Sequence, residues 1–189
     1  ALPILKSSLS INLTLSDDFI DIVAGGYDLA IRIADLSDSS LVARRLAPVR
    51  RVLCASRTYV EEHGLPQTID DLKNHRCLPA HNNDLWRLEG PEGAFNLRPE
   101  GLLVTNSSEV IREAVISGLG IALRSTWDIG PELKSGALVQ VLPAYEGSRN
   151  VALSAVYSSR RFLPAKVRLF IDYLAGLYGP LPYWDKDAL

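Results

Sequence analysis

Apolar and polar residues alternate with two different periods along this chain, which predicts a mixture of strands and helices. Ser10–Leu15 has an apolar residue at every second position, the pattern of a strand with one buried face. Similar short apolar runs recur along the chain between helical patterns, and this order is typical of the α/β class. The predicted strands are 10–15, 27–33, 41–46, 49–55, 86–88, 94–97, 102–105, 121–123, 138–142 and 151–157.

Spacings of three and four between apolar residues predict helices between these strands. The first is capped by Ser16 and Asp17 and ends at Gly25. The last begins at Pro164 and stops before Gly179. The remaining predicted helices begin at Thr58, Thr68, Asn106 and Asp128.

Three segments need separate interpretation. Ala1–Leu5 has the pattern of a helix end with no strand before it, so we expect a β-α-β unit that lacks its first half. Leu41–Leu46 and Val49–Ala55 flank Pro48 and predict a hairpin-like pair. Leu181–Leu189 shows no period and is expected to be loosely ordered.

The charge balance argues against a chain that binds nucleic acid by itself. The formal net charge is -2 and the pI is near 5.9. Duplex binding needs a basic face that displaces counterions from phosphates. The densest basic stretch has strand-like spacing and is interpreted as a solvated rim rather than a DNA contact; it consists of Arg44, Arg45, Arg50, Arg51 and Arg57.

Membrane and secretory signals are also missing from the sequence. No apolar run approaches the ~18 residues that span a bilayer. The start of the chain lacks the basic-then-apolar pattern of a secretory signal. We therefore expect a cytoplasmic protein with no membrane contact, and the alternative is a mature form that has lost its signal.

No constellation of residues supports catalysis or a metal site. His63, His75 and His81 lie at predicted helix ends or loops without ligand-like spacing. Cys54 and Cys77 form neither a C-x-x-C pair nor a disulfide framework, so we expect reduced, partly buried thiols, with a reactive redox thiol as the alternative. No phosphate loop, nucleophile elbow or dinucleotide fingerprint occurs. The expectation is a protein that is not an enzyme and holds no cofactor.

Polar residues at one helix start favour ligand binding instead. In open α/β sheets, ligands settle beyond the carboxyl ends of strands, where helix N-termini offer free N–H groups. Asn106, Ser107 and Ser108 suit a carboxylate or hydroxyl, although plain N-capping explains them equally well. Arg32 alternates with apolar residues inside a strand, where it can face an anionic ligand or form a structural salt bridge.

Several segments resemble the LysR-type transcription regulators of bacteria, from about Ala1 to Leu177. The two most specific are Tyr27–Leu36 and Tyr157–Asp172. The others are Ser40–Leu46, Arg51–Ser56, Asp71–Leu78 and Gly118–Leu123, of which the last is weak by itself.

The resemblance implies the effector-sensing domain of such a regulator. Its fold would be α/β, with two Rossmann-like lobes linked by two crossover segments, as in type 2 periplasmic binding proteins. Lobe I would hold residues 1–54 and 150–178, lobe II residues 55–149, and 179–189 would form a C-terminal tail. A small metabolite, anionic or aromatic, would bind between the lobes. A homodimer or homotetramer would pass the response to DNA through a separate N-terminal helix-turn-helix.

By position, the resemblance also implies effector contacts at the strand ends and helix starts. The candidate effector-binding residues are Ser16, Asp17, Arg32, Asn106, Ser107 and Ser108. The helix-turn-helix, its linker helix and the first lobe I strand with its following loop are expected to be absent from this sequence. Because that loop supplies ligand contacts in the family, the pocket would be incomplete here.

Other functions remain open on the sequence. One is a periplasmic-type solute-binding protein that lacks its signal peptide, for which the sequence upstream of Ala1 is the discriminator. Another is a hydrolase or transferase, disfavoured because no catalytic set occurs. The last is a regulator domain with a purely oligomerising role, in which replacing Arg32 and Ser107 by alanine leaves the effector response unchanged.

Overall fold

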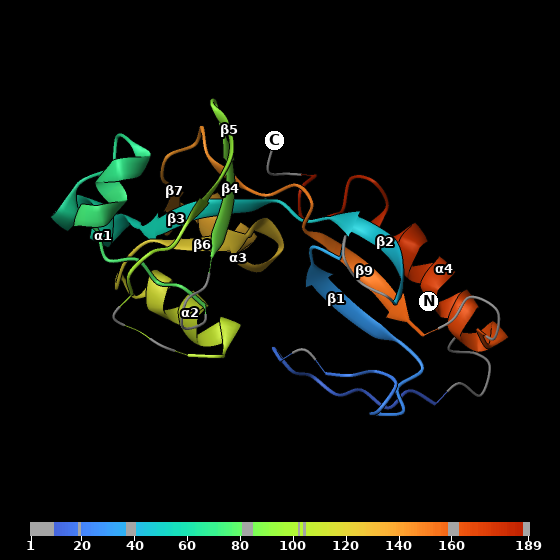
Figure 1. The fold of residues 1–189 in the computed structure, drawn as a ribbon. Helices are drawn as coiled ribbons and strands as arrows, with labels where there is room; N and C mark the ends of the chain where they lie inside the picture. The colour runs from blue at the N-terminus through green and yellow to red at the C-terminus, as the bar shows by residue number, and fades with distance from the viewer. Residues whose placement is uncertain are drawn as a thin grey trace. The chain divides into compact units, whose positions relative to one another are not determined.

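The computed structural model describes residues 10–18, 20–36, 41–80, 85–101, 103, 105–158 and 163–186. Within them the chain divides into two compact units, each with its own sheet (Figure 1). Unit 1 contains residues up to Pro48 together with Asn150–Tyr183. Unit 2 contains Val49–Arg149 and the residues from Trp184 onward.

Some sequence predictions lie outside the described residues. They are the helix end at Ala1–Leu5 and the position of His81. Part of the predicted strand at 102–105 also lies outside them.

Unit 1 has a three-stranded antiparallel sheet with the order β1-β9-β2. Its strands are β1 (Ala30–Ala34), β9 (Ala152–Tyr157) and β2 (Val42–Pro48). The central strand β9 is buried along its whole length because it has a neighbour on each side. Helix α4 (Ala165–Tyr178) packs on β2 through an apolar stripe at helical spacing, formed by Val167, Ile171 and Leu174.

The outer edge of β1 is open, and the predicted strand beside it does not form. β1 pairs with β9 on one side only, among the described residues. Ser10–Leu15, predicted as a strand, has no regular secondary structure, so that prediction is wrong. A strand needs a neighbour for its backbone hydrogen bonds, and the described residues offer this segment none. Its alternating apolar side chains are therefore exposed: Ile11 by 54%, Leu13 by 74% and Leu15 by 84%.

The helix predicted after Ser16 is also absent, and a single turn at Ile22–Gly26 replaces it. The Asp21 carboxylate accepts hydrogen bonds from the backbone N–H groups of Val23 (2.9 Å) and Ala24 (3.1 Å). Aspartate side chains that bond nearby amides in this way compete with helix formation. The chain then turns at the two glycines and enters β1.

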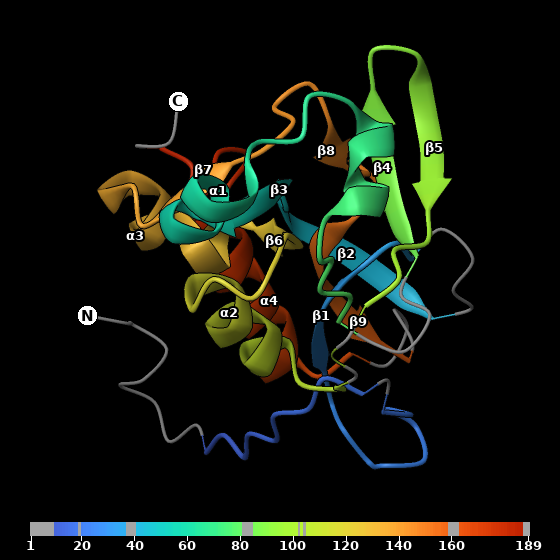
Figure 2. The same ribbon diagram turned by 90° about the vertical axis from the view of Figure 1, so that its left-hand side faces the viewer.

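Unit 2 is built on a six-stranded sheet with the path order β5-β4-β8-β3-β6, and β7 also pairs with β3. The strands β4 and β5 form an antiparallel hairpin, as predicted (Figure 2). Every named strand pair is antiparallel, and the described parallel pairing is confined to isolated bridges at Cys77. The strands are β3 (Arg51–Ser56), β4 (Trp86–Gly90), β5 (Gly93–Leu97), β6 (Ala122–Ser125), β7 (Leu138–Gln140) and β8 (Glu146–Gly147).

Helices cover the two faces of this sheet, and β3 shows why. Its alternate residues enter two different apolar clusters: Leu53 joins one cluster with Tyr59, and Cys54 joins the other with Ile111 and Val115. A strand buried on both faces reads as a continuous apolar run, as β3 does. The helical elements of unit 2 are α1 (Arg57–His63), the 3-10 helix η2 (Ile69–Asn74), α2 (Ser108–Ile116) and α3 (Thr126–Ser135).

Helix ends in unit 2 largely follow the sequence signals. The Asp71 carboxylate accepts the Thr68 backbone N–H at 2.8 Å, as the predicted cap requires. Gly136 ends α3 in the left-handed conformation, with φ 75°, which glycine adopts without strain. Asn106 is not the cap of α2, because the cap is Ser107.

One predicted pairing near the unit boundary is wrong. β2 and β3 do not form a hairpin around Pro48, since β2 pairs with β9 in unit 1 and β3 is the centre of the unit 2 sheet. For the same reason, the boundary expected after Cys54 differs from the observed one after Pro48. The tail is not loose throughout: the buried Asp185 accepts a hydrogen bond from Thr126 Oγ1 at 2.6 Å.

Candidate functional site

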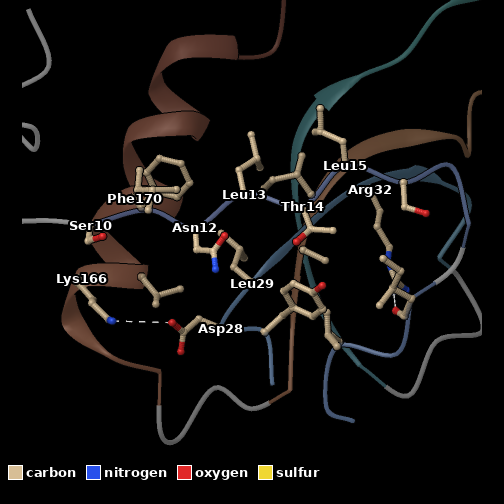
Figure 3. Close-up of a pocket in the computed structure, with 18 of the residues that line it drawn as sticks. Ser10, Asn12, Leu13, Thr14, Leu15, Asp28, Leu29, Arg32, Lys166 and Phe170 are labelled. Carbon is tan, nitrogen blue, oxygen red and sulfur yellow. Dashed lines mark hydrogen bonds and ion pairs between the residues drawn. The ribbon is translucent and has the colours of Figure 1, made fainter. Parts of the chain in front are cut away.

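Unit 1 contains a groove between the irregular segment 10–16 and the open edge of β1 (Figure 3). Its volume is about 410 Å³, and apolar side chains form most of its surface. Residues of α4 contribute to one wall, including Val167 and Phe170. A space of this size is within the range of small-molecule sites, but both long walls are backbone segments rather than converging side chains.

Two of the candidate effector-binding residues line this groove, namely Ser16 and Arg32. Arg32 lies at the middle of β1, opposite Ser154 of β9. Its guanidinium donates a hydrogen bond to the backbone carbonyl of Ile20. The Ser16 hydroxyl accepts the backbone N–H of Asp18 at 3.1 Å. Asp17 is exposed and does not line the groove.

Charged groups lie toward the two ends of the groove, and Asn12 and Thr14 lie between them beside Leu13 (Figure 3). Lys166 of α4 forms an exposed ion pair with Asp28 at 3.8 Å, drawn as a dashed line in Figure 3. In the same view, Leu13 and Leu15 lie between this pair and Arg32. The charged groups available to a ligand are therefore concentrated near Arg32 and near Lys166.

The other three candidate residues lie together at the start of α2 in unit 2. The Ser107 hydroxyl accepts the Val110 backbone N–H at 3.4 Å and so caps the helix. The backbone N–H of Ser107 donates in turn to Thr105 Oγ1 at 3.0 Å. Asn106 precedes the cap, and Ser108 is the first helical residue. This N-terminus combines hydroxyl groups with the positive end of a helix dipole, which favours an anion.

The start of α2 contacts a buried arginine that the sequence analysis did not single out. Arg124, at the end of β6, is 6% exposed and donates from Nη1 to Ser108 Oγ at 3.1 Å. Its Nε donates to Asp128 Oδ2 at 2.8 Å, and Nη2 reaches the same carboxylate. No local pattern marks this pair, because Arg124 lies in β6 and Asp128 in α3, so the helical spacing of four does not apply to them.

Further charges extend this pair across two helices. Arg112 of α2 forms ion pairs with Glu113 and Glu132 and lies 3.5 Å from Asp128 Oδ1. The network fixes the start of α2 relative to α3. Because its two arginines pair with carboxylates, it supports the helix start rather than forming a separate anion site.

The two cysteines are free, buried and protonated. Burial raises the pKa of the Cys54 thiol to about 12, although the nearby Arg124 lowers it and Asp128 raises it further. Burial likewise raises the pKa of Cys77 to about 11. A thiol reacts as its thiolate, so neither residue is suited to redox chemistry at neutral pH. The expected reduced and buried state agrees with the structure.

Two of the histidines pack against Tyr59 rather than around a metal. The His63 ring stacks on Tyr59 at 4.4 Å, and His75 Nδ1 lies 3.2 Å from the Tyr59 hydroxyl. Desolvation by burial, followed by the charge of His63, lowers the pKa of His75. No group of three or more potential metal ligands occurs in the part of the chain that the structure describes.

None of the helices in the described ranges is both long and apolar enough to cross a bilayer.

Comparison with known families and structures gives a consistent match. The model of the LysR substrate binding domain matches residues 6–178. The HTH-type transcriptional regulator DmlR of Escherichia coli (strain K12) is 39% identical over 170 residues, covering 88% of this chain and 55% of the regulator. The transcriptional activator TtdR of the same strain is 36% identical, covering 88% of this chain and 54% of the activator. The chain thus spans about half the length of these curated relatives.

Solved structures show the same relationship. The full-length virulence activator AphB of Vibrio cholerae, a member of the LTTR family, has a TM-score of 0.77 and 28% identity, and the match covers 92% of this chain and 60% of that protein. The regulatory domain of AphB from Vibrio vulnificus has a TM-score of 0.68 and 33% identity, covering 80% of this chain and 76% of that domain. These matches confirm the predicted α/β fold of the type 2 periplasmic-binding kind.

Proposed function

Because this chain belongs to the family of LysR substrate-binding domains, we propose that it senses a small effector and controls DNA binding by a separate part of a bacterial regulator. The observation that carries this proposal is the family match over residues 6–178, nearly the whole chain. The curated relatives are named as helix-turn-helix transcription regulators or activators, which favours regulation over periplasmic solute binding. A regulator of this kind works in the cytoplasm as a homodimer or homotetramer.

We propose candidate effector contacts in each unit, taken by itself. Unit 1 offers Ser16 and Arg32, and unit 2 offers Asn106, Ser107 and Ser108 at the start of α2. The arginine and the helix N-terminus both favour negative charge. A small carboxylate therefore fits these groups better than a neutral aromatic compound does.

The proposed response is a shift between conformations and involves no catalysis. A ligand changes an equilibrium only by its difference in affinity for the two states. An effector that prefers one arrangement of the domain biases the oligomer and hence the geometry of the DNA-binding parts. Turnover of a bound ligand would contradict this mechanism.

Substitutions at the cap of α2 test the effector site without unfolding the helix. Ser107→Asn and Ser107→Asp both keep a good N-cap residue, but only the second adds a negative charge. We expect Ser107→Asp to weaken binding of an anionic ligand by about tenfold or more, equivalent to ~1.4 kcal/mol, and Ser107→Asn to weaken it far less. Calorimetric titration of the full-length regulator with small carboxylates such as succinate and benzoate measures this difference.

A second pair of variants tests the unit 1 contact. Arg32→Ala is expected to weaken the same carboxylates, whereas Arg149→Ala, which removes an arginine with an 83% exposed side chain in unit 2, is not. Equal affinities for wild type, Arg32→Ala and Ser107→Asp would contradict the proposed site. Such a result with an intact effector response would favour a site elsewhere on the domain. Failure of the wild-type protein to bind any of the tested carboxylates would instead favour the oligomerising role.

A further inference from the structure

A buried tyrosine in unit 2 connects helix α1 to the segment that follows η2. Tyr59 of α1 is 1% exposed, and its hydroxyl accepts the backbone N–H of Arg76 at 3.0 Å. The same hydroxyl lies 3.2 Å from Nδ1 of His75. These two contacts hold residues 75 and 76 against α1.

The contact with Arg76 decides how the hydrogen is placed in the contact with His75. An amide N–H can only donate, so the Tyr59 oxygen acts as the acceptor toward Arg76. The hydrogen of the hydroxyl is then donated to His75 Nδ1, the acceptor that the described part of the chain places within reach. An imidazole that accepts at Nδ1 is neutral and carries its hydrogen on Nε2.

Protonation of His75 conflicts with this arrangement. A charged imidazole carries a hydrogen on both ring nitrogens, so Nδ1 becomes a donor that faces the Tyr59 hydroxyl. The tyrosine would have to turn its own hydrogen away into an almost fully buried site, where a polar hydrogen that lacks an acceptor is unfavourable. The contact between Tyr59 and His75 is therefore compatible with the neutral histidine alone.

The charges around His75 act on it in opposite directions. Burial has the largest effect on the pKa of His75 and lowers it below 6.5, and the charge of His63, whose ring stacks on Tyr59, lowers it further. Asp71 of η2 raises this pKa, but not enough to offset burial. Two backbone N–H groups hydrogen-bond the Asp71 carboxylate and lower its own pKa, so it stays ionised where histidine titrates. The other charged or titratable groups on the adjoining elements are Arg57, Glu61 and Glu62 of α1, Asp70 and Lys73 of η2, Arg76 and Cys77 after it, and Tyr145 before β8.

The segment that Tyr59 holds is also packed tightly against the end of the α2 region. The Arg76 carbonyl accepts the Ile121 N–H at 2.8 Å, and the Leu78 N–H donates to the Ile121 carbonyl at 2.8 Å. Gly120 lies so close that a Cβ on it would be 2.2 Å from the Arg76 carbonyl oxygen. Because packed segments of this kind transmit displacements, a shift of Arg76 reaches the loop between α2 and β6.

We propose that Tyr59 and His75 form a pH-sensitive latch in unit 2, which holds residues 75–78 against α1 while His75 is neutral and releases them when His75 is protonated. Since the pKa of His75 is lowered by folding, the latch is closed above pH 6.5 and opens as the pH falls through the lowered value. The released segment loosens its pairing with Ile121. This response goes beyond effector sensing and does not depend on it, because the latch residues are not among the proposed effector contacts.

Hydrogen–deuterium exchange of the full-length protein, over a series from about pH 7.5 to about pH 4.5, tests the latch. Protection factors are compared, because they remove the direct effect of pH on the chemical rate of exchange. We expect protection at residues 76–78 to fall at least about tenfold toward the acid end, while residues 129–133 of α3 change by less than about twofold. Constant protection at residues 76–78, or an equal fall in α3, would overturn the proposal.

Three variants distinguish a latch from a merely structural contact. His75→Gln offers an amide oxygen to the Tyr59 hydroxyl but cannot titrate, so protection at Arg76 should stay high to the acid end. Tyr59→Phe keeps the buried ring but removes the acceptor of the Arg76 amide, so protection there should be low at every pH. His63→Gln is the matched control: the fall should persist and move to higher pH, because the charge that lowers the pKa of His75 is gone. A fall that is unchanged in His75→Gln would overturn the proposal.

Discussion

The strands of the two units differ in how completely neighbouring elements cover them. In unit 2, β3 lies between other strands and is covered on both faces, so Leu53, Cys54 and Ala55 are completely buried. In unit 1, β1 has a neighbour on one side only among the described residues, and Ile31 and Ile33 remain exposed. The comparison teaches that a central strand covered on both faces is completely buried, whereas a strand at the edge of a sheet keeps apolar side chains exposed.

The largest expected effect contrasts the core of unit 2 with the exposed segment of unit 1. Trp86→Ala empties a site that is 1% exposed and should destabilise the protein by about 3–5 kcal/mol. Leu15→Ala removes a side chain that is 84% exposed and should change stability by less than about 0.5 kcal/mol in residues 1–189. Urea unfolding of the two variants measures the contrast. A large loss for Leu15→Ala would contradict the exposure of this side chain.

A smaller loss of stability is expected when the buried ion pair that contacts the start of α2 is broken. Arg124→Met leaves the Asp128 carboxylate without its main partner and should destabilise unit 2 by about 2–3 kcal/mol. The loss stays below that of a fully isolated charge because Arg112 lies 3.5 Å from the same carboxylate. Arg149→Met breaks an exposed pair with Glu89 and should lose only about 0–1 kcal/mol. Equal losses for the two variants would contradict a supporting role for Arg124.

The cap of α2 should contribute about half as much to stability as Arg124 does. Ser107→Ala removes the acceptor for the Val110 N–H and should destabilise the protein by about 1 kcal/mol. Ser107→Asn should restore most of this loss, since asparagine is an equally good cap. Thermal unfolding provides the measurement. A loss that asparagine does not restore would mean that Ser107 acts through another contact.

The smallest expected effect is on the pH dependence of unit 2. Burial lowers the pKa of His75 in the folded state below its ordinary value of 6.5. The unfolded chain therefore binds the proton more readily, and stability is fully present above pH 6.5 and falls as the pH drops through the lowered pKa. His75→Gln should reduce this fall in the free energy of unfolding at low pH. Substitutions in unit 1 should leave the fall unchanged. The measurement is urea unfolding at several pH values. Identical profiles of unfolding free energy against pH for the variant and the wild type would contradict the prediction.

Much of the fold could be predicted because local patterns decided it. The β4–β5 hairpin, the end of α3 at Gly136 and the apolar stripe of α4 all follow from residues close in sequence. The failures occur where a distant or missing neighbour decides the outcome. Ser10–Leu15 has a clear strand pattern but no strand to pair with, and β2 and β3 flank Pro48 yet join different sheets.

The candidate site was predictable only in part for the same reason. Ser107 and Ser108 could be singled out because a helix start carries a local signature. Arg124 could not be singled out, because its role depends on a hydrogen bond to Ser108, a residue 16 positions away in the sequence. Asp17 was chosen as part of a helix cap, and it is exposed outside the groove because that helix does not form.

We propose that an anionic effector binds this domain, with Arg32 of unit 1 and the start of α2 in unit 2 as separate candidate contacts. Hydrogen–deuterium exchange of the full-length regulator, with and without excess succinate or benzoate, tests it most directly. The account predicts that a carboxylate which binds slows exchange at Ser107–Val110 and around Arg32, and that Ser107→Asp abolishes this protection while Ser107→Asn keeps it. A bound carboxylate that protects neither segment would contradict the claim.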